Sequence, residues 1–240
     1  MATTSATPSL SVHQRALRSN VVKKAIMAVT GLVLITFLLF HMFGNLKMFV
    51  DAEAYNHYAS WLHDDILYPI LPHGWFIWIF RVVLLACLVG HVYCAASLWR
   101  AARHARSSKY VHAAHRPEQT YAARTMRVGG VILLLLVIFH LLMFTTRSVQ
   151  IGFDSASTPY EMMIGAFSLE NWWVVLIYAI FVGVVCMHVR HGFWSAFTTL
   201  GANVGPNARI ALNCLAYFVA VLLFVGFMLP PVAIMFGMVN

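Results

Sequence analysis

The sequence predicts an all-α integral membrane protein whose five transmembrane helices form one bundle. Of the 240 residues, 61% are hydrophobic and 10% are charged, whereas soluble domains are nearer half apolar and a quarter charged. Mean hydropathy is +0.77. Five apolar stretches also reach the roughly 20 residues that a helix needs to cross a bilayer. The segments between them are too short for a catalytic domain, so residues 1–240 are expected to form a single membrane domain.

The elements follow one another simply. A polar arm at residues 1–20 comes first, and no cleavage pattern typical of a secretory signal follows it. The transmembrane helices are expected near residues 22–45, 75–99, 126–147, 171–193 and 209–229. All four cysteines lie in apolar segments and are interpreted as small packing residues: Cys87, Cys94, Cys186 and Cys214.

The net charge of +8 is distributed unevenly about the expected helices. One side holds 13 of the 16 basic residues: Arg15, Arg18, Lys23, Lys24, Arg100, Arg103, Arg106, Lys109, Arg116, Arg124, Arg127, Arg190 and Arg209. The other side holds seven of the eight acids: Asp51, Glu53, Asp64, Asp65, Asp154, Glu161 and Glu170. The positive-inside rule then places the N-terminus in the cytoplasm. A basic face of this kind favours anionic lipid and a cytoplasmic partner over nucleic acid.

Each of the first four expected helices contains one histidine well inside its apolar stretch: His41, His91, His140 and His188. Polar residues within a bilayer are costly and tend to mark function. Because successive helices run in opposite directions, His41 and His140 fall in the outer half, and His91 and His188 in the inner half. Two imidazoles at one depth can hold a haem iron between them, and bundle interiors are where such sites are built. The sequence predicts two haems, one above the other.

Two other interpretations of the histidines remain open. Each imidazole could hydrogen-bond to a neighbouring helix and hold no cofactor. Alternatively, Cys94 and Cys186 could join His91 and His188 in a Rieske-type iron–sulfur site. Against that set, residues 186 and 188 point about 200° apart on a regular helix.

The segment KKAIMAVTGLVLITFLLFHMFGNLKMF, together with one histidine in each of the next three helices, resembles the membrane subunit of succinate dehydrogenases. It is most similar to the single-chain, five-helix, dihaem cytochrome b anchor that also serves some fumarate reductases. The resemblance covers residues 20 to 235 or so.

This resemblance implies a membrane-anchor subunit of a succinate:quinone oxidoreductase in a bacterial plasma membrane. A flavoprotein subunit with FAD and an iron–sulfur subunit would dock on the cytoplasmic face, and succinate would be oxidised there, outside this chain. The anchor would pass electrons through two b-type haems to a quinone, generally menaquinone. His91 and His188 would ligate the proximal haem, and His41 and His140 the distal haem.

Further site residues are expected around these haems. Haem propionates need cations or hydrogen-bond donors, and the candidates are Arg81, Arg127 and Arg190, with Lys23, Lys24 and Arg147. Quinone reduction consumes protons, and the outer loop offers titratable groups for an outer quinone site: His63, Asp64, Asp65 and Tyr68. The same loop could be solvated beside an aromatic belt. An inner quinone site near Ser19, Lys23 or the loop of His112 and His115 stays open.

The chain departs from some dihaem relatives at one position. Where those have a glutamate two residues before the haem histidine of the fourth helix, this chain has Cys186, and no acid lies inside an expected helix. The departure puts a carboxylate proton path in doubt. The remaining alternatives are the anchor of another quinone-linked oxidoreductase, such as a nitrate reductase or formate dehydrogenase, and a haem-free transporter. Those anchors usually gather two haem histidines on one helix, and transporters show broken helices and repeats.

Overall fold

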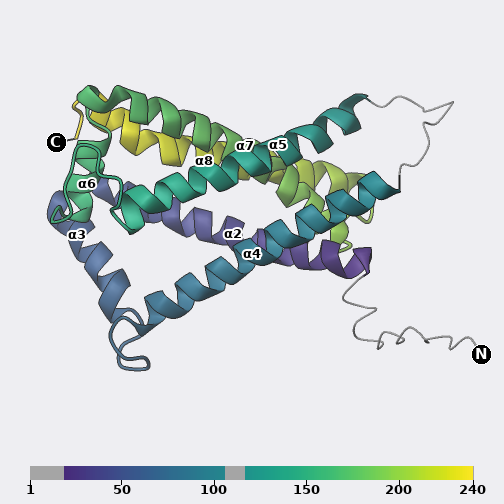
Figure 1. Ribbon diagram of the computed structural model, residues 1–240, viewed down its shortest axis with the longest axis horizontal. Helices are drawn as coiled ribbons and strands as arrows, with labels where there is room; N and C mark the ends of the chain where they lie inside the picture. Colours follow the sequence, from purple (N-terminus) through teal and green to yellow (C-terminus); the bar gives the residue numbers. More distant parts are fainter. Residues whose placement is uncertain (1–18, 106–116, 240) are drawn as a thin grey trace, which may run out of the picture.

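The computed structural model describes residues 19–105 and 117–239, with the backbone alone for residues 117–124. Within these ranges every regular element is helical, and five helices are long and apolar enough to cross a membrane (Figure 1). The predicted all-α, five-helix transmembrane architecture is confirmed.

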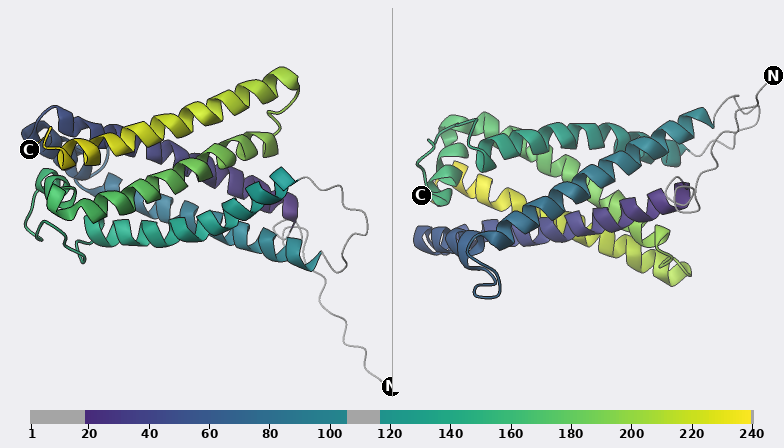
Figure 2. Two further views of the ribbon diagram at one scale, coloured as in Figure 1. Left: turned by 90° about the horizontal axis from the view of Figure 1, so that it is seen from above. Right: turned by 60° about the horizontal axis from the view of Figure 1, so that its bottom comes forward.

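The five long helices are α2 (Asn20–Leu46), α4 (Trp75–His104), α5 (Pro117–His140), α7 (Trp172–Thr199) and α8 (Pro206–Met235). They run up and down along one common direction, with α2 and α4 crossing at a shallow angle (Figures 1 and 2). Helices α4, α7 and α8 extend past the expected bounds. Hydropathy marks only the hydrocarbon-crossing part of a helix, whereas backbone hydrogen bonding continues through the headgroup layer.

Local capping fixes where several helices begin. The Ser19 hydroxyl accepts a hydrogen bond from the amide of Val22, at 3.1 Å, at the start of α2. The Asp51 carboxylate accepts from the amide of Ala54 at 2.6 Å and starts α3 (Ala52–Ser60). Such caps satisfy amides that would otherwise lack partners in the first turn.

The short elements gather at one end of the bundle, beside the C-terminus (Figure 1). They are α3, α6 (Pro159–Ala166), and the single turns η1 (Lys47–Phe49), η2 (Trp61–Asp65), η3 (Leu141–Thr145) and η4 (Leu169–Asn171). Helices α3 and α6 are joined by a hydrogen bond of 3.0 Å from the Tyr160 amide to the Asn56 side chain. Two of the turns, η2 and η3, are π-helical, a conformation that is frequent at functional sites. We call this end the short-helix end.

The long helices pack in the order α4, α2, α7, α5. Helix α2 packs along α4 and α7, and α7 packs along α5, while α8 lies against both α2 and α7. In the described residues, α2 with α5 and α4 with α7 have at most slight backbone contact, so these pairs are diagonals of the bundle. Where α2, α7 and α8 meet, the buried residues form a continuous apolar cluster: Ile35, Met42, Val182, Cys186, Val189, Phe193, Ala216, Val219, Ala220 and Leu223.

The predicted charge separation follows from this topology. The described members of the basic group lie toward the end where α2 starts, and the acidic group lies at the short-helix end. Several predicted residues lie outside the described ones: the arm up to residue 18, with Arg15 and Arg18, and the segment with Arg106, Lys109, His112, His115 and Arg116. The side chain of Arg124 is also outside them.

Candidate functional site

The four membrane histidines form two facing pairs. His41 on α2 faces His140 on α5, with ring centres 5.8 Å apart and ring planes at 79°. His91 on α4 faces His188 on α7, with centres 6.2 Å apart and planes at 61°. The rings that lie together are the ones that the sequence pairs by their positions along the helices. Both pairs join diagonal helices, so the imidazoles meet in the interior of the bundle.

The spacing within each pair suits two imidazoles bound to one metal ion. With a metal–nitrogen bond of about 2 Å on each side and each ring centre about 1 Å behind its nitrogen, the ring centres lie about 6 Å apart. Aromatic rings that merely pack together also have centres about 4.5–7 Å apart. The hydrogen bonds of the imidazoles therefore carry more information than the spacing.

Two of the four imidazoles are held through Nδ1. His91 Nδ1 lies 3.1 Å from the carbonyl oxygen of Met27 and 3.4 Å from the Thr30 hydroxyl. His140 Nδ1 lies 3.2 Å from the Tyr178 hydroxyl. When Nδ1 donates to an oxygen, Nε2 is left unprotonated, which is the form that binds a metal.

His188 has a different environment. Its Nδ1 is buried and has no hydrogen-bond partner among the described residues. A buried polar atom without a hydrogen-bond partner reduces the stability of the fold by about 1–3 kcal/mol. A ligand, a water molecule or a partner group that bonds to this nitrogen would remove that cost. This observation favours a polar or metal-bearing occupant at the His91–His188 pair.

Glycines on the neighbouring helices let their backbones approach that pair closely. A methyl group at Gly31 of α2 would lie 3.2 Å from His91 Cε1, and one at Gly130 of α5 would lie 4.0 Å from His188 Cε1. A cavity of about 390 Å³ adjoins His188 between α5 and α7, and Gly129 and Val184 are among its lining residues. This cavity would offer space beside His188 for part of a flat macrocycle.

Aromatic side chains surround the other pair. Phe37 stacks on His41 with ring centres 5.3 Å apart, and Phe227 of α8 lies 5.8 Å away. Phe144 and Phe181 flank His140 at 5.6 and 6.3 Å. Such a lining excludes water and suits an apolar cofactor.

The cysteines do not join the histidines. Cys186 is buried in the cluster between α2, α7 and α8, whereas His188 faces His91, so the predicted divergence along the helix is confirmed. Among the described residues, no three His, Cys, Asp or Glu side chains are grouped as metal ligands. The four-residue set of a Rieske-type site is therefore not assembled.

The three arginines predicted to bind haem propionates, Arg81, Arg127 and Arg190, have different surroundings. Arg190 donates to the Tyr217 hydroxyl at 2.6 Å and lies over its ring, while Arg127 is exposed. Arg81 lies over Trp78, with 5.0 Å from the guanidinium carbon to the ring centre, and in the described part of the chain it has no carboxylate partner.

The other three candidate cations also have contacts or a known position. Lys23 donates to the Ser97 hydroxyl at 2.8 Å, and Arg147 donates to the carbonyls of Ser155 and Ser157. Lys24 lies in the first turns of α2. Of the six cations, Lys23 links α2 to α4, and Arg190 links α7 to α8.

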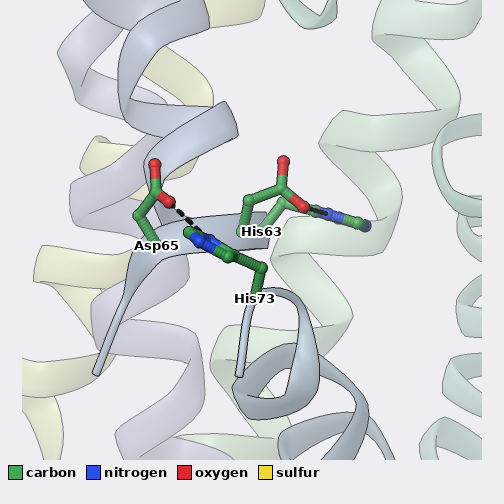
Figure 3. A network of polar contacts seen from close by, with 4 residues as sticks. His63, Asp65 and His73 are labelled. Carbon is green, nitrogen blue, oxygen red and sulfur yellow. Dashed lines mark hydrogen bonds and ion pairs between the residues drawn. The ribbon is translucent and has the colours of Figure 1, made fainter. Parts of the chain in front are cut away.

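Residues 63–73, which contain the predicted quinone-site residues, form two His–Asp pairs at the short-helix end (Figure 3). His63 Nδ1 lies 2.8 Å from the Asp64 carboxylate, and His73 Nδ1 lies 2.9 Å from the Asp65 carboxylate. Tyr68 stacks on His73 with ring centres 4.2 Å apart. The four predicted residues are thus close in space, and all are exposed or partly exposed. Sequence reasoning missed His73, although a histidine eight residues after Asp65 in the same loop was a usable signal.

Two tyrosines of α3 lie between this loop and the bundle. Tyr58 packs on Gly44 of α2, whose added methyl would lie 3.1 Å from the Tyr58 ring, and the Lys47 ammonium is 4.9 Å from the centre of that ring. Burial raises the pKa of Tyr55 to about 12, with a smaller contribution from Tyr58, and burial also raises the pKa of Tyr58. Both hydroxyls therefore stay protonated near neutral pH.

Comparisons with protein-family models, with curated proteins and with solved structures gave no match for this chain.

Proposed function

We propose that the chain is a dihaem cytochrome b that anchors a succinate:quinone oxidoreductase in the membrane. The observation that carries the proposal is the arrangement of the histidines: two imidazole pairs, each spanning a diagonal of the bundle at a spacing of about 6 Å. The choice of succinate as the ultimate electron donor rests on the sequence resemblance.

In this function, a haem b bound at each pair supplies a one-electron redox centre. His41 and His140 would hold the iron of one haem, and His91 and His188 would hold the iron of the other. Met27 fixes the ring of His91 through its carbonyl oxygen. The aromatic side chains around His41 and His140 keep water out.

The charge distribution supports an orientation and a docking face. Basic residues toward the start of α2 support a cytoplasmic location for that end, in line with the positive-inside rule. An iron–sulfur subunit, itself bound to a flavoprotein subunit, docks there and delivers electrons first to the His91–His188 pair. Succinate is oxidised in the flavoprotein, so this chain is an electron-transfer subunit.

Quinone reduction needs protons, and the His–Asp pairs of the outer loop are the candidate source. In this function menaquinone binds beside the His41–His140 pair, and Asp64 and Asp65 exchange protons with the exterior through His63 and His73. An inner site near Ser19 and Lys23 is the competing location, and substitution of the aspartates distinguishes the two.

The test is a reduced-minus-oxidised optical spectrum of the purified chain, combined with identification of the chains that co-purify. The expected result is a b-type α-band with two haems per chain, and co-purification of a flavoprotein and an iron–sulfur protein. A colourless chain would overturn the cytochrome assignment. Two haems with different soluble partners would retain the cytochrome and overturn the succinate assignment.

A further inference from the structure

Tyr178 places a hydroxyl group deep in an apolar part of the bundle. It lies on α7, and 8% of its surface is exposed. Aromatic rings enclose it, with ring centres 5.1–6.3 Å away: Phe139, Phe144, Phe167 and Phe181. A phenylalanine would fill this space equally well, so packing alone does not account for the hydroxyl.

The hydroxyl connects two groups that come from one stretch of the chain. It lies 3.2 Å from His140 Nδ1 and 3.9 Å from the sulfur of Met143. Met143 is fully buried and belongs to η3, the π-helical turn that begins directly after His140. The wider turn thus places a sulfur and an imidazole nitrogen within reach of one hydroxyl group.

The chemistry of the three groups sets the direction of the hydrogen bonds. Thioether sulfur only accepts, so the Tyr178 hydroxyl hydrogen points to Met143. The phenolic oxygen is then free to accept from His140 when the imidazole carries its proton on Nδ1. In that tautomer Nε2 of His140 is unprotonated and free to bind a metal.

We propose that Tyr178 is a positioning residue that holds His140 as the Nε2-ligating tautomer and adjusts the electron-donating strength of that imidazole. The proposal rests on the proposed dihaem function. A ligand histidine that donates its N–H to an oxygen is a stronger electron donor to the metal. Hydrogen bonding of this kind is one of the means by which a protein sets haem potential.

The two pairs differ in how this adjustment is made. His91 donates to a backbone carbonyl, that of Met27, which no substitution of a side chain removes. His140 donates to a side-chain hydroxyl, which Tyr178→Phe removes while keeping the ring. Without the Tyr178 hydroxyl as hydrogen-bond acceptor, His140 would donate less electron density to the iron. The oxidised iron would then be less stable, and the midpoint potential of that haem alone would rise.

The experiment is an optical redox titration of the purified complex that carries Tyr178→Phe. We expect both haems to be retained, and the reduced-to-oxidised ratio of one haem to rise about tenfold at fixed potential, which is a shift of about 59 mV for one electron. Introducing Tyr178→Phe into a His188→Ala background identifies the haem, because only the His41–His140 step remains there and that step should shift.

Tyr55→Phe is the matched control. It removes a hydroxyl from the same apolar cluster, from α3, and should leave both potentials unchanged. If Tyr178→Phe fails to assemble, the variant Met143→Leu tests the proposal instead. Leucine keeps the packing but removes the sulfur to which the Tyr178 hydroxyl donates, so the phenolic oxygen becomes a weaker acceptor for His140. A small rise in the same step supports the proposal.

The outcomes separate this inference from the function on which it rests. The role of Tyr178 is overturned if Tyr178→Phe keeps its full haem content and both potentials are unchanged. The same result in Met143→Leu overturns it if Tyr178→Phe does not assemble. In both cases the cytochrome assignment stands. Wild-type chain without haem overturns the function itself.

Discussion

Gly31 on α2 lies against the imidazole of His91 on α4, so that a methyl group at position 31 would come within 3.2 Å of His91 Cε1. A contact this short forces the ring to shift by a few tenths of an ångström. Because His91 also bonds to the Met27 carbonyl from the same helix, the ring has little freedom to move.

Under the proposed dihaem function, Gly31→Ala is therefore expected to reduce haem occupancy at the His91–His188 pair. Gly130→Ala is the matched control, because its added methyl would lie at an ordinary 4.0 Å from His188 Cε1. Haem content and redox titration of both variants check this. Equal occupancy in the two variants would show that the Gly31 contact does not position the ring.

Under the proposed function, His188→Ala should remove one haem and leave the other. The two imidazole pairs lie on different diagonals, so each iron would lose its ligands independently. The measurement is a redox titration, in which one of two steps should disappear. Loss of both steps from a chain that still folds would contradict independent sites.

Gly226→Ala should destabilise the contact between α2 and α8. A methyl group there would collide with the buried Met42 side chain, and overpacking of this kind costs about 1–3 kcal/mol. Gly183→Ala is the control, since no atom lies within 4 Å of its added methyl. Thermal unfolding in detergent compares the two, and an unchanged midpoint for Gly226→Ala would mean that Met42 moves aside freely.

Under the proposed function, replacing Asp64 and Asp65 together with asparagine should slow quinone reduction, because both His–Asp pairs lose their carboxylate. Glu53→Gln is the control, an exposed acid at the start of α3. The readout is electron transfer from succinate to a soluble quinone analogue by the intact complex. An unchanged rate would move the quinone site to the opposite end of the bundle.

Tyr55 should contribute to alkaline unfolding. Its pKa is raised to about 12 in the fold, against about 10 when unfolded. Between these values the unfolded chain loses the proton and the folded chain keeps it, so stability falls as pH rises from about 10 to about 12. Tyr55→Phe should remove part of this fall in unfolding curves. Identical pH curves for wild type and Tyr55→Phe would contradict this.

Much of the fold follows from the sequence because the bilayer restricts the possibilities. A stretch of apolar residues must be a helix there, and successive helices must be antiparallel. The relative depths of His41 and His140 therefore depend only on where each histidine lies along its helix and on the order of the helices. The pairing of those two rings is a direct consequence.

Other features of the site arise from contacts between different helices, and the periodicity of a single helix does not predict them. Gly44 and Gly192 lie one turn from His41 and His188 on the same helices, where helical periodicity alone would place space beside an imidazole. The structure instead places Tyr58 against Gly44, and the glycines nearest the imidazoles are Gly31 and Gly130, on neighbouring helices. Tyr178 was missed for the same reason, since nothing in the sequence connects it to His140.

The placement of the histidines has a consequence for how the helices are held together. In the described part of the chain, α2, α7 and α8 share a continuous apolar cluster, while α4 packs mainly along α2 and α5 mainly along α7. Under the proposed function, iron at the two imidazole pairs would add a link from α4 to α7 and a link from α5 to α2. A chain without haem would lack both of these links across the bundle.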